Sequence, residues 1–340
     1  MATRTSKRNG VDRRRLLTLA GGAAVGLAGA NFSGTRFTTA QEATPVPIKG
    51  QIAFGQPDRT ADVYKPLIAG AKLEGQARGY EVLESFAEGR ADKQIAEINN
   101  WIGSGVKGMT ILPLDEKAMQ PAIEKAHAAG IVFVSYSDII PNADGYTIFD
   151  SRGGADMVGE WVGNWIKENA GGKAEIASLT ADFHETGRQR IGGAERKIQE
   201  LVPDAKIVNR TEAVLAPEAF TATQSILQAN PNVNVILCIA DDGCLGAAQA
   251  FAATGRDPNT MCIVGWDGSR EVMKKILEGG PIRATGALDL LAIGHSAIWV
   301  PANIIENKEP KNYTSQYVLV TADTPDEAKK LIDAYDIVVD

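Results

Sequence analysis

Three carboxylates follow short apolar runs in places where acidic side chains could bind a ligand. Residues 261–264 are apolar and precede Gly-Trp-Asp-Gly-Ser, so Asp267 falls at the carboxyl end of a predicted strand. Residues 235–240 run in the same way into Asp241, and residues 131–136 run into Ser137-Asp138. In open α/β sheets, ligands bind outside these strand ends. An aspartate in such a turn can also simply cap the following helix, so one motif alone leaves both interpretations open.

The arrangement occurs twice in the chain. Residues 106–138 and residues 235–267 each have the pattern of a strand, an acidic turn, a helix, a glycine, a strand and an acidic turn. In the second copy the glycine is Gly255, which closes the predicted helix after Thr254. A repeat of this length indicates two similar α/β halves rather than a short solenoid period. Two such lobes would each present carboxylates at their strand ends, with a binding cleft between them.

Catalytic and metal-binding patterns are hard to find. The sequence has no Gly-x-Ser-x-Gly elbow, no phosphate-binding Gly-x-x-x-x-Gly-Lys-Ser/Thr loop and no Gly-x-Gly-x-x-Gly after the first strand. The three histidines are far apart, although His184 could line the cleft, and the cysteines lack Cys-x-x-Cys spacing. Asp241 and Asp242 are adjacent and would point in different directions, unlike a glycosidase pair. We expect no enzyme, no metal site and no cofactor.

Length, charge and cysteine positions further limit the kind of protein that this chain can be. The chain has 340 residues, 44% of them apolar, which is enough for two domains with separate cores. The net charge of -7 argues against a nucleic-acid partner, whose phosphates need a basic surface. Cys238 and Cys262 fall in neighbouring predicted strands, where disulfide geometry is restrictive, so we expect buried free thiols.

The first 40 residues have the character of an export signal. Arg13, Arg14 and Arg15 precede an apolar run over residues 16–30, which is too short and glycine-rich to be a lasting membrane helix. The arginines resemble a twin-arginine signal. Cleavage could follow Ala30 or Ala40; the second site would leave residues 41–48 as a flexible mature terminus. No cysteine lies near either site, so a lipid anchor is not expected; a basic tail on a cytoplasmic protein is the alternative.

From Gly50 onward, strands and helices alternate, which predicts an α/β fold with two doubly wound parallel-sheet lobes. We assign residues 49–150 and 289–315 to the N-terminal lobe, and residues 151–288 and 316–340 to the C-terminal lobe. The hinge then has three segments, near residues 149–154, 287–291 and 312–317. No run of 18 apolar residues follows the signal.

Polar and aromatic side chains at the predicted strand ends suit a hydroxylated ligand. Carboxylate and guanidinium groups can each engage adjacent hydroxyls, and aromatic rings pack on the C–H faces of sugars. Five aspartates against two arginines disfavour an anionic ligand, so we predict a neutral monosaccharide or polyol, with an amino-bearing or nucleoside-like molecule as the alternative. The predicted ligand-binding residues are Asp58, Arg59, Tyr64, Tyr136, Asp138, Arg190, Asp241, Trp266, Asp267 and Asp289.

The chain resembles the periplasmic sugar-binding proteins of the ribose-binding type. Residues 264–268 (Val-Gly-Trp-Asp-Gly) are similar to the family's V-G-F-D-G, residues 239–242 to its A-x-N-D, and residues 188–190 to its R-x-R at a helix start. The resemblance implies the type I periplasmic-binding fold, a cleft that closes on its ligand, and the permease of an ABC importer as partner. It also implies that Arg190, Asp241 and Asp267 face the sugar.

Several positions depart from the family pattern. Ser137-Asp138 stands where the family often has Asp-Arg, and Leu288 stands where a glutamine is expected. Aspartate replaces the family's asparagine at 241, and the first loop carries Asp58, Arg59, Val63 and Tyr64 instead of amides and two phenylalanines. The ligand is therefore expected to differ from ribose. A sugar-responsive transcription repressor shares the fold, but its helix-turn-helix would occupy the place of the export signal.

Overall fold

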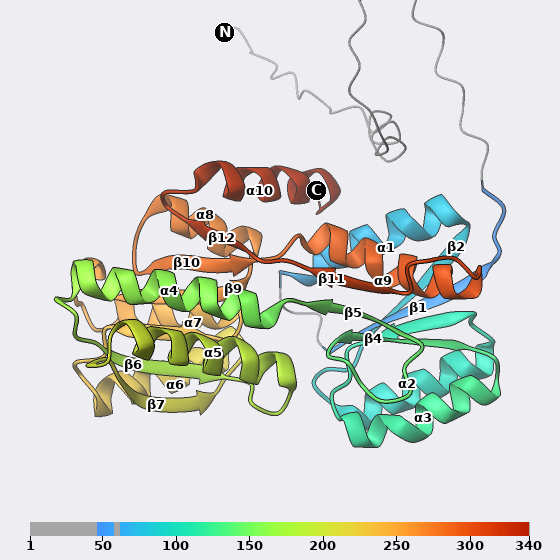
Figure 1. Cartoon of the computed structure of the whole chain (residues 1–340), viewed down its shortest axis with the longest axis horizontal. Helices are drawn as coiled ribbons and strands as arrows, with labels where there is room; N and C mark the ends of the chain where they lie inside the picture. Colours follow the sequence, from blue (N-terminus) through green and yellow to red (C-terminus); the bar gives the residue numbers. More distant parts are fainter. Residues whose placement is uncertain (1–45, 58–61, 340) are drawn as a thin grey trace, which may run out of the picture. The chain divides into compact units, whose positions relative to one another are not determined.

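The structure is a computed structural model that describes residues 46–57 and 62–339 of the chain. The predicted export signal, residues 41–45 of the predicted flexible terminus, Asp58 and Arg59 lie outside the described residues. Within that part of the chain, strands and helices alternate and form two six-stranded sheets (Figure 1). The predicted α/β class with two parallel-sheet lobes is confirmed.

The first sheet is parallel throughout, in the order β11-β5-β4-β3-β1-β2. Helices α1 and α9 pack together on one side of it, and α2 and α3 pack together on the other (Figure 1). The strands are β1 (Gly50–Gln56), β2 (Tyr80–Phe86), β3 (Gly108–Ile111), β4 (Val132–Ser137), β5 (Gly145–Phe149) and β11 (Asn312–Ser315), and the helices are α1 (Tyr64–Arg78), α2 (Ala91–Ser104), α3 (Glu116–Ala128) and α9 (Leu290–Ile305).

The second sheet repeats this order as β12-β10-β9-β8-β6-β7. Helices α4 and α5 pack as one pair and α6 and α7 as another, and α10 contacts α8. The strands are β6 (Glu175–Thr180), β7 (Lys206–Glu212), β8 (Val235–Cys238), β9 (Cys262–Asp267), β10 (Ile282–Ala287) and β12 (Val318–Thr321), and the helices are α4 (Ser151–Asn169), α5 (Glu185–Leu201), α6 (Ala216–Ala229), α7 (Asp241–Ala252), α8 (Arg270–Glu278) and α10 (Pro325–Val339).

The internal repeat seen in the sequence corresponds to equivalent places in the two sheets. Residues 106–138 supply β3 and β4, and residues 235–267 supply β8 and β9, which occupy matching positions in the two strand orders. Parallel strands bring their carboxyl ends to one edge of the sheet. Each sheet therefore has one edge where the acidic turns gather.

Two features of the last strands differ from the sequence prediction. Asn312–Ser315, predicted only as a hinge crossing, forms β11 and pairs with β5, and β12 runs antiparallel to β10. The segment of β11 is polar and partly exposed, so it has no apolar alternation that would mark a strand. Its pairing is decided by the open edge of β5, which offers unpaired backbone groups.

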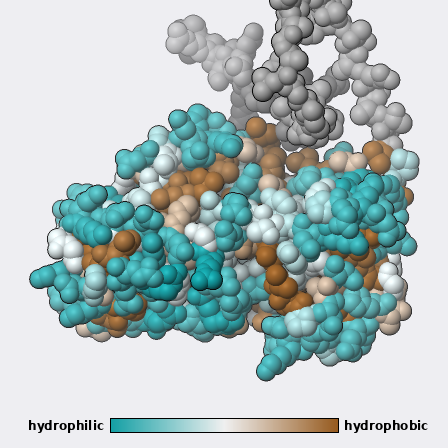
Figure 2. Space-filling view, in the orientation of Figure 1, coloured by the Kyte–Doolittle hydropathy of each residue, from teal (hydrophilic) through white to brown (hydrophobic). Residues whose placement is uncertain are grey.

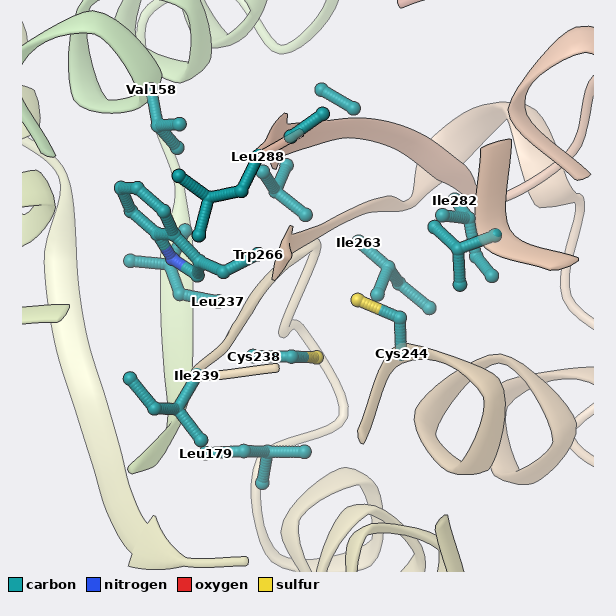
Figure 3. Packing of buried hydrophobic residues seen from close by; sticks show 14 of the residues in the cluster. Val158, Leu179, Leu237, Cys238, Ile239, Cys244, Ile263, Trp266, Ile282 and Leu288 are labelled. Carbon is teal, nitrogen blue, oxygen red and sulfur yellow. The ribbon is translucent and has the colours of Figure 1, made fainter. Parts of the chain in front are cut away.

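The core of the second sheet surrounds β8, β9 and β10. Trp266 lies beside Val158 and Leu288 in this core (Figure 3). Gly286 makes room for the indole, because a Cβ there would stand 2.7 Å from the Trp266 ring. The three cysteines are free and buried, which confirms the expectation of buried thiols.

The chain crosses between the two sheets at three places, after β5, after β10 and after β11. The first and third crossings are neighbours, because the Asp150 N–H donates to the Ser315 carbonyl at 2.9 Å. At the second crossing, the Tyr335 hydroxyl donates to the Leu288 carbonyl at 2.9 Å and accepts from the Leu290 N–H at 3.0 Å. The exact lobe boundaries given above remain predictions.

Much of the face in Figure 2 is hydrophilic, with hydrophobic residues in small groups. Among residues 46–57 and 62–339, none of the helices combines the length and apolar character needed to cross a membrane.

The Tyr335 hydroxyl provides a test of the second crossing. We expect Tyr335→Phe to lower the free energy of unfolding by about 1–3 kcal/mol, because two buried backbone groups lose their shared partner. Urea denaturation measures this change. Tyr146→Phe is the matched control, since the Tyr146 hydroxyl has no hydrogen-bond partner among the described residues; equal stability losses in both variants would contradict the assignment.

Candidate functional site

A cavity of about 540 Å³ lies where strand ends of both sheets face each other. Its lining includes residues at or just after the ends of β1, β3 and β4 of the first sheet, and of β6, β8 and β9 of the second. Four predicted ligand-binding residues line it: Tyr64, Tyr136, Arg190 and Asp267. A depression of about 760 Å³ along β7 and α6 contains none of the predicted residues.

Arg190 is the buried cation of this cavity. It lies in the second turn of α5, where its side chain is only 6% exposed. Its Nη1 donates to Asp267 Oδ1 at 2.8 Å and to the Ile239 carbonyl at 3.2 Å, and its Nε donates to the Tyr317 hydroxyl at 2.8 Å. Burial opposes the charge, but Tyr317 and Asp267 outweigh it and raise the pKa of Arg190. The guanidinium is therefore held as a fixed cation.

Aromatic rings surround the Arg190 guanidinium. Its carbon lies 5.6 Å from the centroid of the Phe149 ring, 5.5 Å from that of Trp266 and 5.4 Å from that of Tyr317. Ring faces stabilise a cation electrostatically. The guanidinium therefore contacts β9 through Trp266, the first crossing through Phe149 and the third crossing through Tyr317.

Asp267 ends β9 in a strained backbone conformation. Its φ is 104°, and Gly268 after it has a φ of 78°. Side chains rarely tolerate this region, and such strain is concentrated at functional sites. The conformation turns the carboxylate toward Arg190, while Ser269 caps α8 by accepting from the Val272 N–H. Asp267 Oδ2 has no partner among the described residues and can accept a hydrogen bond from a ligand.

Tyr136 and Tyr64 add aromatic surface to the cavity. Tyr136 packs edge-on against Phe54 and Phe149, and Tyr64 packs edge-on against Phe86. Burial raises the pKa of Tyr136, so its hydroxyl stays protonated and can donate.

His184 also lines the cavity, as the sequence allowed. Its Nδ1 accepts from the Gly187 N–H at 3.0 Å, where it caps α5. Burial lowers the pKa of His184, so the neutral ring carries its proton on Nε2. Nε2 is thereby left as a donor.

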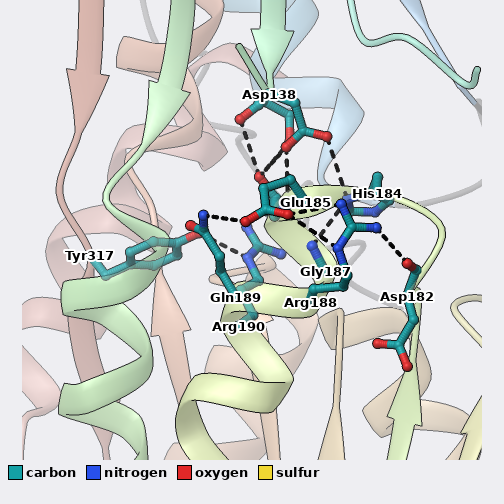
Figure 4. A network of polar contacts seen from close by, with 11 residues as sticks. Asp138, Asp182, His184, Glu185, Gly187, Arg188, Gln189, Arg190 and Tyr317 are labelled. Atoms are coloured by element: carbon teal, nitrogen blue, oxygen red, sulfur yellow. Dashed lines mark hydrogen bonds and ion pairs between the residues drawn. The ribbon is translucent and has the colours of Figure 1, made fainter. Parts of the chain in front are cut away.

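Asp138 does not line the cavity but bridges the two sheets. From the end of β4, its Oδ1 accepts from the Thr186 N–H at 3.0 Å and from the Thr186 hydroxyl at 2.7 Å (Figure 4). The Ser137 hydroxyl donates to Thr186 Oγ1 at 3.1 Å. The first turn of a helix has unpaired N–H groups that attract a carboxylate, which explains why Asp138 turns to α5.

Asp241 and Trp266 lie behind the cavity. Asp241 is fully buried and accepts from the Ser269 N–H at 2.6 Å and from the Thr285 hydroxyl at 2.8 Å. Burial, with Asp267 as a second cause, raises the pKa of Asp241 to about 8. Trp266 is 1% exposed and does not line the cavity, but its ring lies against Arg190, which does. Both residues support the side chains that line the cavity.

Asp289 is exposed and caps α9, where its Oδ1 accepts from the Ala292 N–H at 3.0 Å. Asp289 therefore caps the helix that follows it, which is the alternative role of an aspartate in such a turn. Asp58 and Arg59 lie outside the described residues. In that part of the chain, no cluster of three or more His, Cys, Asp or Glu side chains could hold a metal ion.

The apolar part of the lining was not among the predicted site residues. Some of these positions follow strands, as Leu114 follows β3 and Leu288 follows β10. Val63 and Leu288 were signalled in the sequence only as departures from the family pattern. The apolar residues concerned include Val63, Leu67, Leu112, Leu114, Phe149, Phe183, Leu215, Leu288 and Leu290.

Comparisons with known proteins are consistent with this architecture. A family model described as a periplasmic binding protein domain matches residues 52–309. A ribose import binding protein of Bacillus subtilis is 26% identical over 71% of this chain and 76% of its own length. A D-apiose import binding protein of Actinobacillus succinogenes is 29% identical over 69% and 76%, respectively. The crystal structure of an ABC transporter solute binding protein from Mycobacterium smegmatis with bound glycerol has a TM-score of 0.76, with 26% identity over 82% of this chain and 96% of its own.

Asp241 makes stability depend on pH. Its pKa is raised from 3.8 to about 8, so the folded carboxyl keeps a proton that the unfolded one releases. Its contribution to the free energy of unfolding therefore falls as pH rises between these values, by up to about 1.4 kcal/mol per pH unit. We expect Asp241→Asn to remove this decline in urea denaturation between pH 5 and 7, whereas Asp333→Asn on the exposed face of α10 retains it. A decline of the same slope in Asp241→Asn would contradict the assignment.

The contact between Asp138 and Thr186 should hold the two sheets together. We expect Asp138→Ala to increase the radius of gyration of the ligand-free protein in small-angle scattering, because a carboxylate that satisfies two donors across the cleft is lost. Asp182→Ala is the control, since Asp182 pairs with Arg210 within the second sheet's own lobe. An unchanged radius in Asp138→Ala would show that this contact does not limit opening.

Proposed function

The chain belongs to the periplasmic binding protein domain family, and from this premise we propose that it captures a neutral sugar or polyol and delivers it to the permease of an ABC importer. The names of its relatives support this proposal, since they are import binding proteins for ribose and D-apiose. Proteins of this family act outside the cytoplasm. The export signal proposed for residues 1–40, of twin-arginine type and without a lipid anchor, fits that location.

The observation that carries the proposal is the ion pair of buried Arg190 and partly buried Asp267. The carboxylate keeps one oxygen free to accept, and the Arg190 Nη2 has no partner among the described residues and is free to donate. A donor and an acceptor side by side match two neighbouring hydroxyls of a polyol.

Charge balance at this pair favours a neutral ligand. Asp267 is already neutralised by Arg190, so a cationic amine would find no unpaired carboxylate there, and an anion would find no unpaired cation. The amino-bearing alternative therefore has less support than the neutral sugar. We assign ligand contacts to Tyr64, Tyr136, Arg190 and Asp267, with His184 as a further donor.

Closure of the two lobes around the ligand is the proposed mechanism. A ligand that contacts Tyr136 from the first sheet and Arg190 from the second stabilises the arrangement in which both line one cavity. The permease would then recognise the closed form.

Calorimetry with pentoses, hexoses, polyols, amines and sugar phosphates tests the ligand class. We expect binding within the neutral group, and Asp267→Ala should weaken it about 30-fold or more, or about 2 kcal/mol, because a buried ligand hydroxyl loses a charge-assisted bond. Asp267→Asn should lose less, since its amide oxygen can still accept. Asp333→Ala on α10 is the control. Binding only of amines or phosphates, or full affinity in Asp267→Ala, would refute the proposal.

A further inference from the structure

Much of the lining of the cavity is apolar, and we call these side chains the leucine wall. Leucines contribute to this wall from three separate places: the loop after β3, the start of α6 and the second crossing. Side chains from the α1 region add further apolar surface. The residues are Val63, Leu67, Leu112, Leu114, Leu215 and Leu288.

The backbone of this wall offers little to a ligand. Gln94, which is 3% exposed, donates to the Leu112 carbonyl at 2.8 Å, and its Oε1 accepts from the Leu114 N–H at 3.0 Å. These two backbone groups are satisfied from α2, behind the loop. The loop therefore presents its leucine side chains to the cavity, while its polar groups are bonded elsewhere.

Several other polar groups of the lining are wholly or partly engaged. The Ser137 hydroxyl donates to Thr186, whose own hydroxyl donates to Asp138. Glu218 Oε2 accepts from the Val214 and Leu215 N–H groups at 3.3 and 3.5 Å, as part of the cap of α6. The groups left for a ligand are Tyr136, His184, Arg190 and Asp267, whose charges act on one another, and Glu218 Oε1 at the start of α6.

We propose that the ligand is a neutral carbohydrate with one apolar edge, a deoxygenated sugar or an alkyl glycoside. Its hydroxylated edge meets Arg190, Asp267 and Tyr136, and its methyl or alkyl group packs on the leucine wall. A hydroxyl placed against that wall would lose its bonds to water without replacement, whereas a methyl group gains from burial. This inference rests on the proposed function and specifies the ligand of the same site.

Matched ligand pairs test the inference by calorimetry. Each pair differs at one position: L-fucose and L-galactose, L-rhamnose and L-mannose, 5-deoxy-D-ribose and D-ribose, and methyl glycosides with their parent sugars. In the pair that binds best, the apolar member should bind about tenfold more tightly, which corresponds to about 1.4 kcal/mol. Equal or tighter binding of the hydroxylated member in every pair would overturn this inference alone. Lack of binding by any neutral carbohydrate would overturn the proposed function as well.

Variants of the wall provide a second test. Leu114→Gln and Leu288→Gln place an amide on the wall, and each should reduce the tenfold preference toward one or reverse it. Leu114 lies in a loop and is only half-buried, so its variant does not depend on repacking the core around Leu288. Leu73→Gln is the control, because Leu73 is 44% exposed on α1 and lies outside the cavity. An unchanged preference in both folded wall variants would overturn the inference.

Discussion

The ion pair between buried Arg190 and partly buried Asp267 is the interaction on which the site depends. Removing a guanidinium and a carboxylate from water is costly unless both are paired and hydrogen-bonded. Arg190 meets that requirement with Asp267, the Ile239 carbonyl and the Tyr317 hydroxyl, and three aromatic rings surround its charge. The strained φ of Asp267 is maintained by this well-determined environment.

The same cluster connects ligand chemistry to the crossings between the sheets. Phe149 ends β5 just before the first crossing, and Tyr317 belongs to the third. The Leu288 N–H, at the second crossing, donates to the Asp267 carbonyl at 3.0 Å. Gly154 lets the Tyr317 ring approach α4, since a Cβ there would overlap it. A ligand that moves Arg190 or Asp267 would therefore act directly on all three connections.

The acidic turns show how one sequence pattern can have several structural outcomes. Asp267 faces the cavity, Asp138 joins the two sheets through α5, Asp241 is buried beneath β9, and Asp289 caps its own helix. All four lie just after strands and near helix starts. The donors that each carboxylate meets decide its role: helix N–H groups bind Asp138 and Asp289, and internal groups bind Asp241.

The sequence alone determined the α/β alternation, the repeat of two halves and the position of Asp267 and Arg190 at the ends of buried elements. These features depend on local periodicity and on turns, which neighbouring residues specify. The edge pairing of β11, the burial of Trp266 and the leucine wall were decided by the tertiary structure. Each depends on which distant segments come into contact. The open edge of β5 pairs with a polar strand whose residues lie 166 positions later, and Gln94 of α2 binds backbone groups of the loop after β3 from behind the cavity. Local sequence does not specify such distant partners, because the free energy of these contacts arises only once the chain has folded.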